Sequence, residues 1–429
     1  MVVAGDRTNA ASGDRIVASV IVALAALLPV MIVLAHRGVA PVVIAMGLVV
    51  AMRPAVWRAG VDGLLLAPVG ARSDFVIAAR FFFAFCLWAL AAGLWSPHEG
   101  AWKVGLNALA PALASGAVIF EIARIAPREA DRIAKAFAIC MAVAIGGLIF
   151  EAATNGFLRT ITPPVDVSPG RAKDIIALGR GATIIAITLA PALLLFNRYA
   201  GRRLLLIAIG AAFAIASFRF GIFSNVIAVF AGGLGFALCI RARGAAISFV
   251  AGLWIAFLLL APLAALLPAD AMISDLSGRA PASWLQRLAI WKTAGVAAVD
   301  CQPFGCGAEY ARVLHQSAPM IEIAGAFGPV SSLPLHPHNL FLQIWLELGL
   351  PGVALLAAAL WFGARAVSAA ALAAPEKAAV AAVAAAMLVS ALFEASLWQV
   401  WRNATLGLAA ILVALSHQQR KSGATAQSA

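Results

Sequence analysis

The stretch AAISFVAGLWIAFLLLAPLAALL, residues 245–267, decides the fold class of this chain. It contains no charged residue, and it is longer than the roughly 20 apolar residues that a helix needs to cross a hydrocarbon core of about 30 Å. The whole chain has a similar character: 63% of its 429 residues are hydrophobic, 12% are charged and the mean hydropathy is +0.97. A soluble domain has an apolar share of roughly 45–50%. The sequence therefore predicts an all-α, polytopic integral membrane protein.

Apolar stretches of similar length recur on both sides of this one and divide the chain into regions. We predict about 12 transmembrane helices, at 16–35, 38–52, 75–95, 104–120, 136–153, 182–197, 204–217, 221–240, 245–267, 350–367, 378–397 and 403–416. The predicted regions are a bundle of spans 1–9 in residues 1–268 with an outside loop at about 154–181, a large outside loop at 269–349 containing short helices, and spans 10–12 with a cytoplasmic tail in 350–429. The polar N-terminal segment is followed by no small-residue cleavage site, so we expect no cleavable signal peptide.

The basic residues indicate how the chain is threaded through the membrane. A net charge of +12 and a pI near 10.4 could suggest a nucleic-acid partner. With the N-terminus placed in the cytoplasm, however, more than half of the 31 basic residues fall on the cytoplasmic side, as the positive-inside rule describes. We therefore predict that both termini are cytoplasmic and that the protein contacts membrane lipids, not nucleic acid.

Two cysteines share the large outside loop. Cys301 and Cys306 stand five positions apart in DCQPFGCG, so in an oxidising compartment they could form a small disulfide. Two free thiols are the alternative, and the sequence leaves both open. The other cysteines, Cys86, Cys140 and Cys239, lie in apolar spans and are expected to pack there.

The large outside loop also contains patterns typical of helices. In SWLQRLAIWKTA, residues 283–294, the side chains of Trp284, Leu288 and Trp291 recur at helical spacing, which predicts a helix lying at the membrane interface.

At the end of this loop, in LPLHPHNLFLQIWLELGLPG, residues 333–352, polar side chains recur every four residues. Asn339, Gln343 and Glu347 form one stripe on an otherwise apolar helix, and we expect that stripe to face water. Pro351 then interrupts the helix, because it lacks a backbone donor and clashes one turn back. The expected order is a short helix at the membrane surface, a kink, and the tenth span.

The residues able to do chemistry are histidines and arginines of the outside segments. His338 stands at a helix start, where the positive end of the helix dipole would keep its imidazole neutral and able to act as a base. His336 precedes Pro337 and is biased towards an extended conformation that could orient the pair. Both could equally be solvated loop histidines, and a metal site formed with His315 is a weaker alternative because no carboxylate or thiolate stands at a convincing spacing.

Three arginines fall on the same side as His338 in the predicted topology. Arg180 stands where the first outside loop enters span 6, Arg219 lies in the turn between spans 7 and 8, and Arg287 is on the amphipathic segment. Each could anchor a lipid phosphate, or the three could converge on a pyrophosphate, whose oxygens each guanidinium can bind in pairs. The sequence contains no Walker A loop, no nucleotide-binding G-x-G-x-x-G, no H-E-x-x-H, no C-x-x-C and no D-x-D pair.

The motifs of this chain resemble those of the O-antigen ligases and the related O-antigen polymerases of the bacterial envelope. The family signature of His, Asn or Ser, nine residues and Gly-x-x-Gly is matched by His338-Asn339, LFLQIWLEL and Gly349 to Gly352. Upstream, Arg287 followed by Ile290-Trp291 and the turn PFGCG at 303–307 is similar to a second family pattern, and Arg180-Gly181 to a third.

The resemblance implies transfer of a glycan from a polyisoprenyl (undecaprenyl) diphosphate to a sugar hydroxyl of the lipid A core, at the periplasmic face of the bacterial inner membrane. His338 would then be the general base, while Arg180, Arg287 and, as a weaker candidate, Arg219 would stabilise the leaving diphosphate. Supporting roles would fall to His336, Asn339, Glu347, Gly349 and Gly352. No metal is needed if the arginines hold the diphosphate, which fits the missing D-x-D, and no cofactor such as ATP is implied because the diphosphate linkage is already activated. The sequence does not give the oligomeric state.

Two other functions remain open from the sequence. A polymerase of the same family would transfer the glycan to another lipid-linked glycan, but polymerases tend to have two comparable arginine-rich loops, whereas here the second loop dominates. A transporter of a solute or lipid-linked sugar could line a path with Arg80 and the histidines, although transporters often show internal repeats and paired broken helices. The ligase is the favoured prediction.

Overall fold

The computed structural model describes residues 2–61, 73–162, 171–200, 203–242, 244–326 and 328–428. The first half comprises α1 (Val2–Ala25), α2 (Leu28–Leu34), η1 (His36–Gly38), α3 (Val39–Ala51), α4 (Pro54–Val61), α5 (Asp74–Ala92), η4 (Ala101–Lys103), α6 (Val104–Arg124), α7 (Pro127–Ala153), α8 (Phe157–Ile161) and α9 (Arg171–Ala200). The second half comprises α10 (Arg203–Arg219), α11 (Phe223–Ala242), α12 (Gly244–Leu260), η5 (Ala261–Leu266), α13 (Ala269–Leu276), α14 (Ala282–Asp300), α15 (Tyr310–Ser317), β1 (Met320–Ile321), β2 (Val330–Ser331), α16 (Leu340–Ala369), α17 (Ala374–Phe393) and α18 (Val400–Ser428).

The predicted fold class is confirmed: the protein is an all-α, polytopic membrane protein. Within the described ranges, nine helical segments are long and apolar enough to cross a membrane, and two shorter apolar ones, His36–Ala51 and Ile207–Arg219, coincide with two further predicted spans. The last predicted span falls in α18. The total of 12 spans stays a prediction, because length and composition alone do not show which helices cross.

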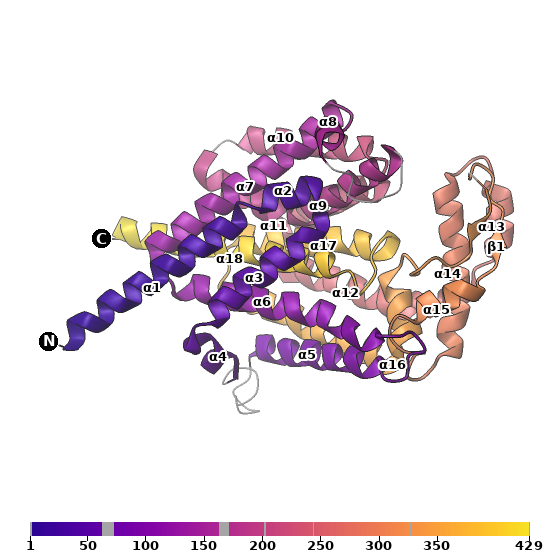
Figure 1. The fold of residues 1–429 in the computed structure, drawn as a ribbon, viewed down its shortest axis with the longest axis horizontal. Coiled ribbons are helices and arrows are strands. Elements are labelled where there is room, and N and C mark those ends of the chain that lie inside the picture. The colour runs from indigo at the N-terminus through magenta and orange to yellow at the C-terminus, as the bar shows by residue number, and fades with distance from the viewer. Residues whose placement is uncertain are drawn as a thin grey trace.

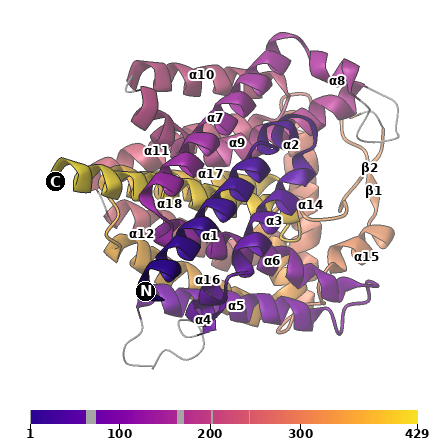
Figure 2. The same ribbon diagram turned by 60° about the vertical axis from the view of Figure 1, so that its left-hand side comes forward.

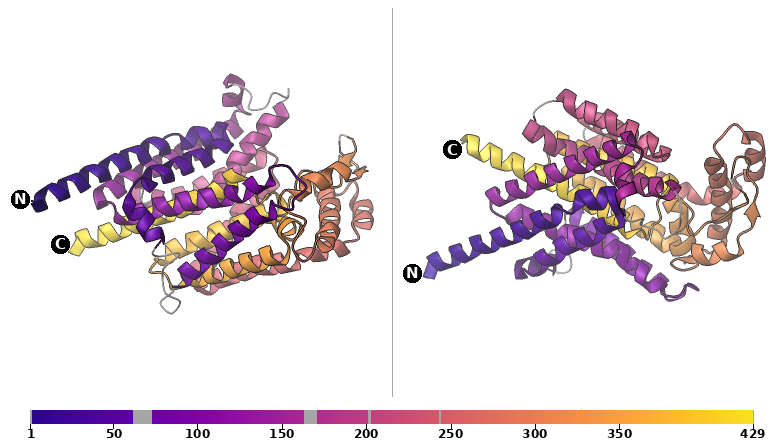
Figure 3. Two further views of the ribbon diagram at one scale, coloured as in Figure 1. Left: turned by 60° about the horizontal axis from the view of Figure 1, so that its bottom comes forward. Right: turned by 45° about the horizontal axis from the view of Figure 1, so that its top comes forward.

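The long helices run side by side, and the large loop caps one end of them (Figure 1). The two termini lie together at the opposite end, which the rotated views also show (Figures 2 and 3). The cap consists of α13, α14, α15 and the antiparallel pair β1–β2, in which Met320 pairs with Ser331. The short helices expected in residues 269–349 are therefore present.

Small residues allow the bundle helices to approach closely. A Cβ atom at Gly47 of α3 would lie 2.3 Å from the Ala114 Cα of α6, and one at Gly235 of α11 would lie 3.0 Å from the Ala381 carbonyl oxygen of α17. Small residues are typical of helix contacts in membranes, where close packing replaces the hydrophobic driving force of water.

The kink predicted in the tenth span is present at Gly349, where φ is +61° and ψ is −161°. A break of this kind frees the carbonyl groups of the preceding turn. Three outside partners take them: the amide of Cys306 donates to Leu346 O at 2.8 Å, the amide of Gly307 to Glu347 O at 3.1 Å, and the indole of Trp88 to Leu348 O at 2.8 Å. The break is therefore fully bonded, and the turn at 303–307 is the main element that it binds.

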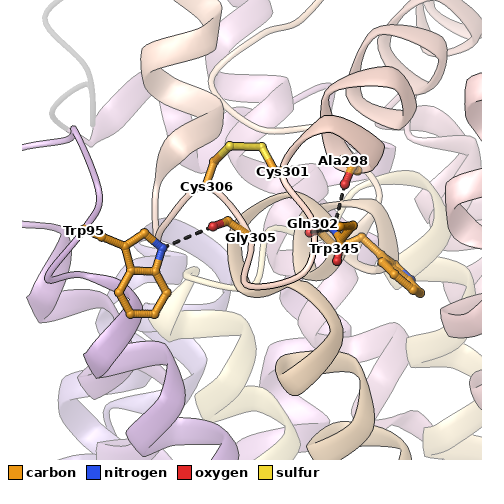
Figure 4. Close-up of a disulfide and its surroundings, with 7 residues drawn as sticks. All are labelled: Trp95, Ala298, Cys301, Gln302, Gly305, Cys306 and Trp345. Carbon is orange, nitrogen blue, oxygen red and sulfur yellow. Dashed lines mark hydrogen bonds between the residues drawn. A yellow bond between two sulfur atoms is a disulfide. The ribbon is translucent and has the colours of Figure 1, made fainter.

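Glycine is required on both sides of this contact. A Cβ atom at Gly349 would lie 2.3 Å from Pro303 O, and one at Gly305 would lie 2.6 Å from Glu347 O, while both residues have positive φ. Cys301 and Cys306 form a disulfide that closes the turn, so the alternative of two free thiols is wrong (Figure 4). The Gly-x-x-Gly and PFGCG motifs thus pack against each other, and this contact fixes the cap to the bundle.

Candidate active site

His338 lies directly before α16, at the junction of cap and bundle. Its φ of +51° is uncommon for a residue with a side chain. The next residue, Asn339, caps the helix, since its side-chain oxygen accepts the amides of Phe341 at 3.0 Å and Leu342 at 3.1 Å. The rings of His336 and His338 lie 4.2 Å apart between centroids, and His336 Nδ1 accepts the His338 amide at 3.3 Å. The local backbone thus fixes the direction of both imidazoles.

Both histidines are neutral near pH 7. Burial, followed by the charges of Arg287 and Arg402, lowers the pKa of His338 to about 4. Burial also lowers the pKa of His336 to about 3, with further contributions from His338, Arg402, Arg312 and Arg180. The neutral state expected for His338 is thus present, and its main causes are burial and arginine charge.

Arg287 is held against the bundle by backbone contacts. Its Nε donates to Phe393 O at the end of α17 at 3.1 Å, and a terminal nitrogen donates to Ser283 O at 2.8 Å. Burial lowers the pKa of Arg287, and the nearby carboxylate of Glu394 opposes this effect. The guanidinium stays charged at any ordinary pH, so it is a fixed cation beside His338.

The helix that carries Arg287 differs from the predicted interfacial helix. Trp284 is 51% exposed, but Trp291 is half-buried and its ring lies 6.0 Å from that of Phe393. The predicted face of Trp284, Leu288 and Trp291 is therefore not the buried one, which is formed by Leu285, Ala289, Ile290 and Ala294.

Arg402 is a residue of this site that the sequence analysis missed. It stands in the first turn of α18 with 3% of its surface exposed, and it bonds to Ser390 and, at 3.0 Å, to Gln399 Oε1. The Glu394 carboxylate lies 4.0 Å from it. The sequence feature that could have identified it is its position in the short connection LWQVWRN, which the predicted topology places on the same side as His338.

The other two predicted arginines differ from each other. Arg180 lies within α9, half-buried, and its charge acts on His336 and Arg402. Arg219 ends α10 with an exposed side chain, and within the described part of the chain it is not among the charges that act on either histidine. Its turn is near the site nevertheless, because the Ser224 hydroxyl, five residues on, donates to Glu394.

The prediction that the stripe on α16 faces water is wrong. Gln343 and Glu347 are 1% and 0% exposed. Gln343 donates to Glu347 at 3.1 Å and accepts the Leu397 amide at 2.9 Å, while Glu347 accepts the Glu309 amide at 2.8 Å and the indole of Trp398. The stripe joins the cap to the connection between α17 and α18, so it faces protein partners that periodicity cannot reveal.

His315 is separate from the paired histidines. Its Nδ1 lies 2.7 Å from Leu333 O and 3.4 Å from the Ser331 hydroxyl. No group of three or more His, Cys, Asp or Glu able to hold a metal occurs among the described residues.

The charges of the site are unequal in number. Among the described residues, the carboxylate of Glu394 lies near both Arg287 and Arg402, so these two guanidiniums share one nearby acidic group, and the charge of Arg180 acts on Arg402 as well. Planar guanidiniums bind phosphate oxygens through charge-assisted hydrogen bonds of about 1.5–3 kcal/mol each. The arrangement can therefore hold a multivalent anion beside a neutral imidazole that is able to accept a proton.

The comparison with protein families agrees with the motifs. Residues 174–357 match the family model described as O-antigen ligase, a range that contains Arg180, Arg287, His338 and the break at Gly349. No curated protein matches the chain. The chain therefore carries the domain of the O-antigen ligase family over residues 174–357.

Proposed function

We propose that this protein is an O-antigen ligase that transfers a glycan from a polyisoprenyl diphosphate to a sugar hydroxyl of the lipid A core. The observation that carries the proposal is the neutral His338 imidazole next to Arg287 and Arg402, in a site with more arginines than carboxylates. A base and a binding site for a diphosphate leaving group are the two parts that this reaction needs.

The chemical step follows from these two parts. His338 takes the proton of the acceptor hydroxyl while that oxygen forms a bond to the anomeric carbon of the donor glycan. The bond from that carbon to the phosphate oxygen breaks, and its electron pair leaves with the diphosphate. Arg287, Arg180 and Arg402 stabilise the charge that grows on the leaving group, whereas Arg219 is exposed and has the weaker claim. The diphosphate ester is already activated, so no ATP and no separate cofactor enters the step.

The arrangement of the chain supports the periplasmic side of the membrane as the place of this reaction. Both termini lie at the end opposite the cap (Figure 3), and the bias of basic residues supports a cytoplasmic location for that end. The site would then face the periplasm of the bacterial inner membrane. A lipid-linked donor could reach it from the membrane, and the apolar helices would contact the isoprenyl chain.

The test is transfer by purified protein in the presence of donor and acceptor. His338→Ala should lower the rate by about 10² to 10⁴, the usual contribution of a general base, with donor binding retained. His315→Ala is the control, because it removes a histidine of the cap that lies outside the site. Full activity of His338→Ala would refute the proposal.

The products decide between the alternatives. A single transfer to lipid A core identifies a ligase, and a ladder of lengthened carrier-linked glycan identifies a polymerase. In cells, carrier-linked glycan that accumulates on the cytoplasmic side after His338→Ala would indicate transport in place of transfer.

A further inference from the structure

His36 is a buried histidine for which the proposed reaction has no use. It lies in η1, between α2 and α3, with 2% of its surface exposed. Among the residues that the structure describes, neither of its ring nitrogens has a hydrogen-bond partner. Buried polar atoms are almost always bonded, and each exception in a native protein calls for a physical reason.

The surroundings of His36 are strongly positive. Arg37, Arg159, Arg180 and Arg402 all lie close enough to repel a proton from its ring. Arg159, which is 7% exposed, donates to Val33 O at 3.2 Å. It therefore contacts the end of α2, the short helix that precedes His36. A neutral ring among so many cations is a hydrogen-bond donor in a field that attracts anions.

One aromatic contact links His36 to the candidate active site. Its ring meets that of Trp401 edge to face, with 5.2 Å between centroids, and the guanidinium of Arg402 lies 4.6 Å from the centre of the same indole. Arg402 and Arg180 act on His36 as well as on His336. The two regions are therefore neighbouring parts of one buried, positively charged region.

Packing alone does not require histidine at this position. A phenyl ring would keep the edge contact with Trp401 and would remove two buried nitrogen atoms that have no hydrogen-bond partner among the described residues, which is costly to the fold. Residues that cost stability in this way are typical of functional sites. The nitrogens of His36 are thus suited to a state in which a ligand is bound.

We propose that His36, Arg159 and Arg402 bind the second phosphoryl group of the carrier diphosphate, the one attached to the polyisoprenyl chain. This inference rests on the proposed function. We base the orientation on the elements that carry these residues: His36 lies in η1 between the bundle helices α2 and α3 and Arg402 in the first turn of α18, whereas Arg287 belongs to the cap helix α14. The phosphoryl group bearing the glycan then lies at Arg287, with the acceptor hydroxyl at His338.

The experiment measures the affinity of purified full-length protein for a short-chain polyisoprenyl diphosphate and for the matching monophosphate. His36→Phe should fold with an unchanged or higher melting temperature, and it should lose diphosphate affinity by about 10- to 100-fold, the value of one or more hydrogen bonds to a charged group. Monophosphate affinity should fall by a similar factor, because the monophosphate retains the phosphoryl group attached to the chain. His36→Gln, which keeps a side-chain N–H donor, should recover part of the loss. His98→Phe serves as the control, because His98 lies in the connection between α5 and η4 and is not among the groups that act on His36.

The outcomes separate this inference from the function on which it rests. Unchanged diphosphate affinity in His36→Phe would overturn it, and so would a loss confined to the diphosphate, because His36 would then serve the phosphoryl group that bears the glycan. Inorganic diphosphate should bind more weakly than the lipid form, and equal binding would assign the site to a soluble anion, against the inference. If the unaltered protein fails to bind the lipid diphosphate at all, the proposed function fails with it.

Discussion

The two ends of α17 carry ion clusters of opposite character. At its start, Glu376 accepts His417 at 2.9 Å, Arg420 at 2.9 Å and the backbone amide of Ala373 at 2.7 Å. At its end, about 27 Å away at 1.5 Å per residue, Glu394 faces Arg402 at 4.0 Å and lies near Arg287. We call these the inner cluster and the outer cluster.

The two clusters differ in how completely their charged groups are paired with partners in the protein. The inner carboxylate is surrounded by donors within hydrogen-bond distance, and both of its side-chain partners come from α18, so the cluster links one helix to the next. The outer cluster has more guanidiniums than carboxylates, and its ion pair is longer. An ion cluster that is complete within the protein stabilises the fold, whereas one with excess charge is suited to a ligand.

Replacing one arginine of each cluster by methionine should give the largest difference between the two clusters. Arg402→Met removes a buried charge that acts on both histidines, and we expect a loss of about 10² to 10³ in kcat/KM, the usual effect of removing one electrostatic contact to a developing charge. Arg420→Met, the matched change in the inner cluster, should leave transfer nearly intact and lower the melting temperature slightly. Equal losses of activity in the two variants would show that the distinction between the clusters has no functional meaning.

The buried pair Gln343 and Glu347 offers a sharper test of how the outer cluster is positioned. In Glu347→Gln an amide nitrogen would face the donating amide of Gln343, so one buried donor loses its acceptor. We expect a loss of about 1–3 kcal/mol in the free energy of unfolding and a fall in activity. The double variant Q343E/E347Q keeps an acceptor for the amides of Leu397 and Glu309 and for the indole of Trp398, because only the bond between the pair reverses.

This double variant should therefore recover most of the stability and activity, measured by chemical denaturation and by transfer. If it is as defective as the single variant, the carboxylate at position 347 has a role other than accepting these hydrogen bonds.

The smallest expected effect is on the pH profile of kcat/KM. His338 has its pKa lowered to about 4 from an ordinary value near 6.5, so it remains a neutral base above about pH 4, and activity should fall only as the pH drops through that value. Removing the charge of Arg402 raises this pKa, so the acidic limb of Arg402→Met should move towards 6.5. A limb that stays in place would mean that the group titrating in this range is not His338.

Periodicity and motifs predicted much of the fold and part of the site. The spacing of apolar stretches predicted the helices, and Pro351 with its flanking glycines predicted the kink, because both are local properties of the chain. The family motif singled out His338 and Arg287. What the stripe of Asn339, Gln343 and Glu347 faces could not be predicted, since periodicity gives the face of a helix but not the element packed against it.

Arg402 and His36 were missed for a related reason. Each stands in a short connection between apolar helices and becomes significant only through contacts made in the fold. His36 meets the ring of Trp401, and Arg402 bonds to Ser390 and lies near Glu394. The pairing of Cys301 with Cys306 was undecided because spacing permits a disulfide without requiring one.

The break in α16 also bears on how the protein can move. A glycine within a long helix is often treated as a swivel, but here the amide of Leu350 donates to Pro303 O at 2.8 Å while the carbonyls before the break bind the turn at 303–307. Backbone on both sides of Gly349 is thus held by the same turn, and the angle between the two halves of the helix is fixed. Any tilting of residues 350–369 in response to bilayer thickness would carry the cap with it, so the distance from His338 to the membrane surface would vary with the lipid in which the protein resides.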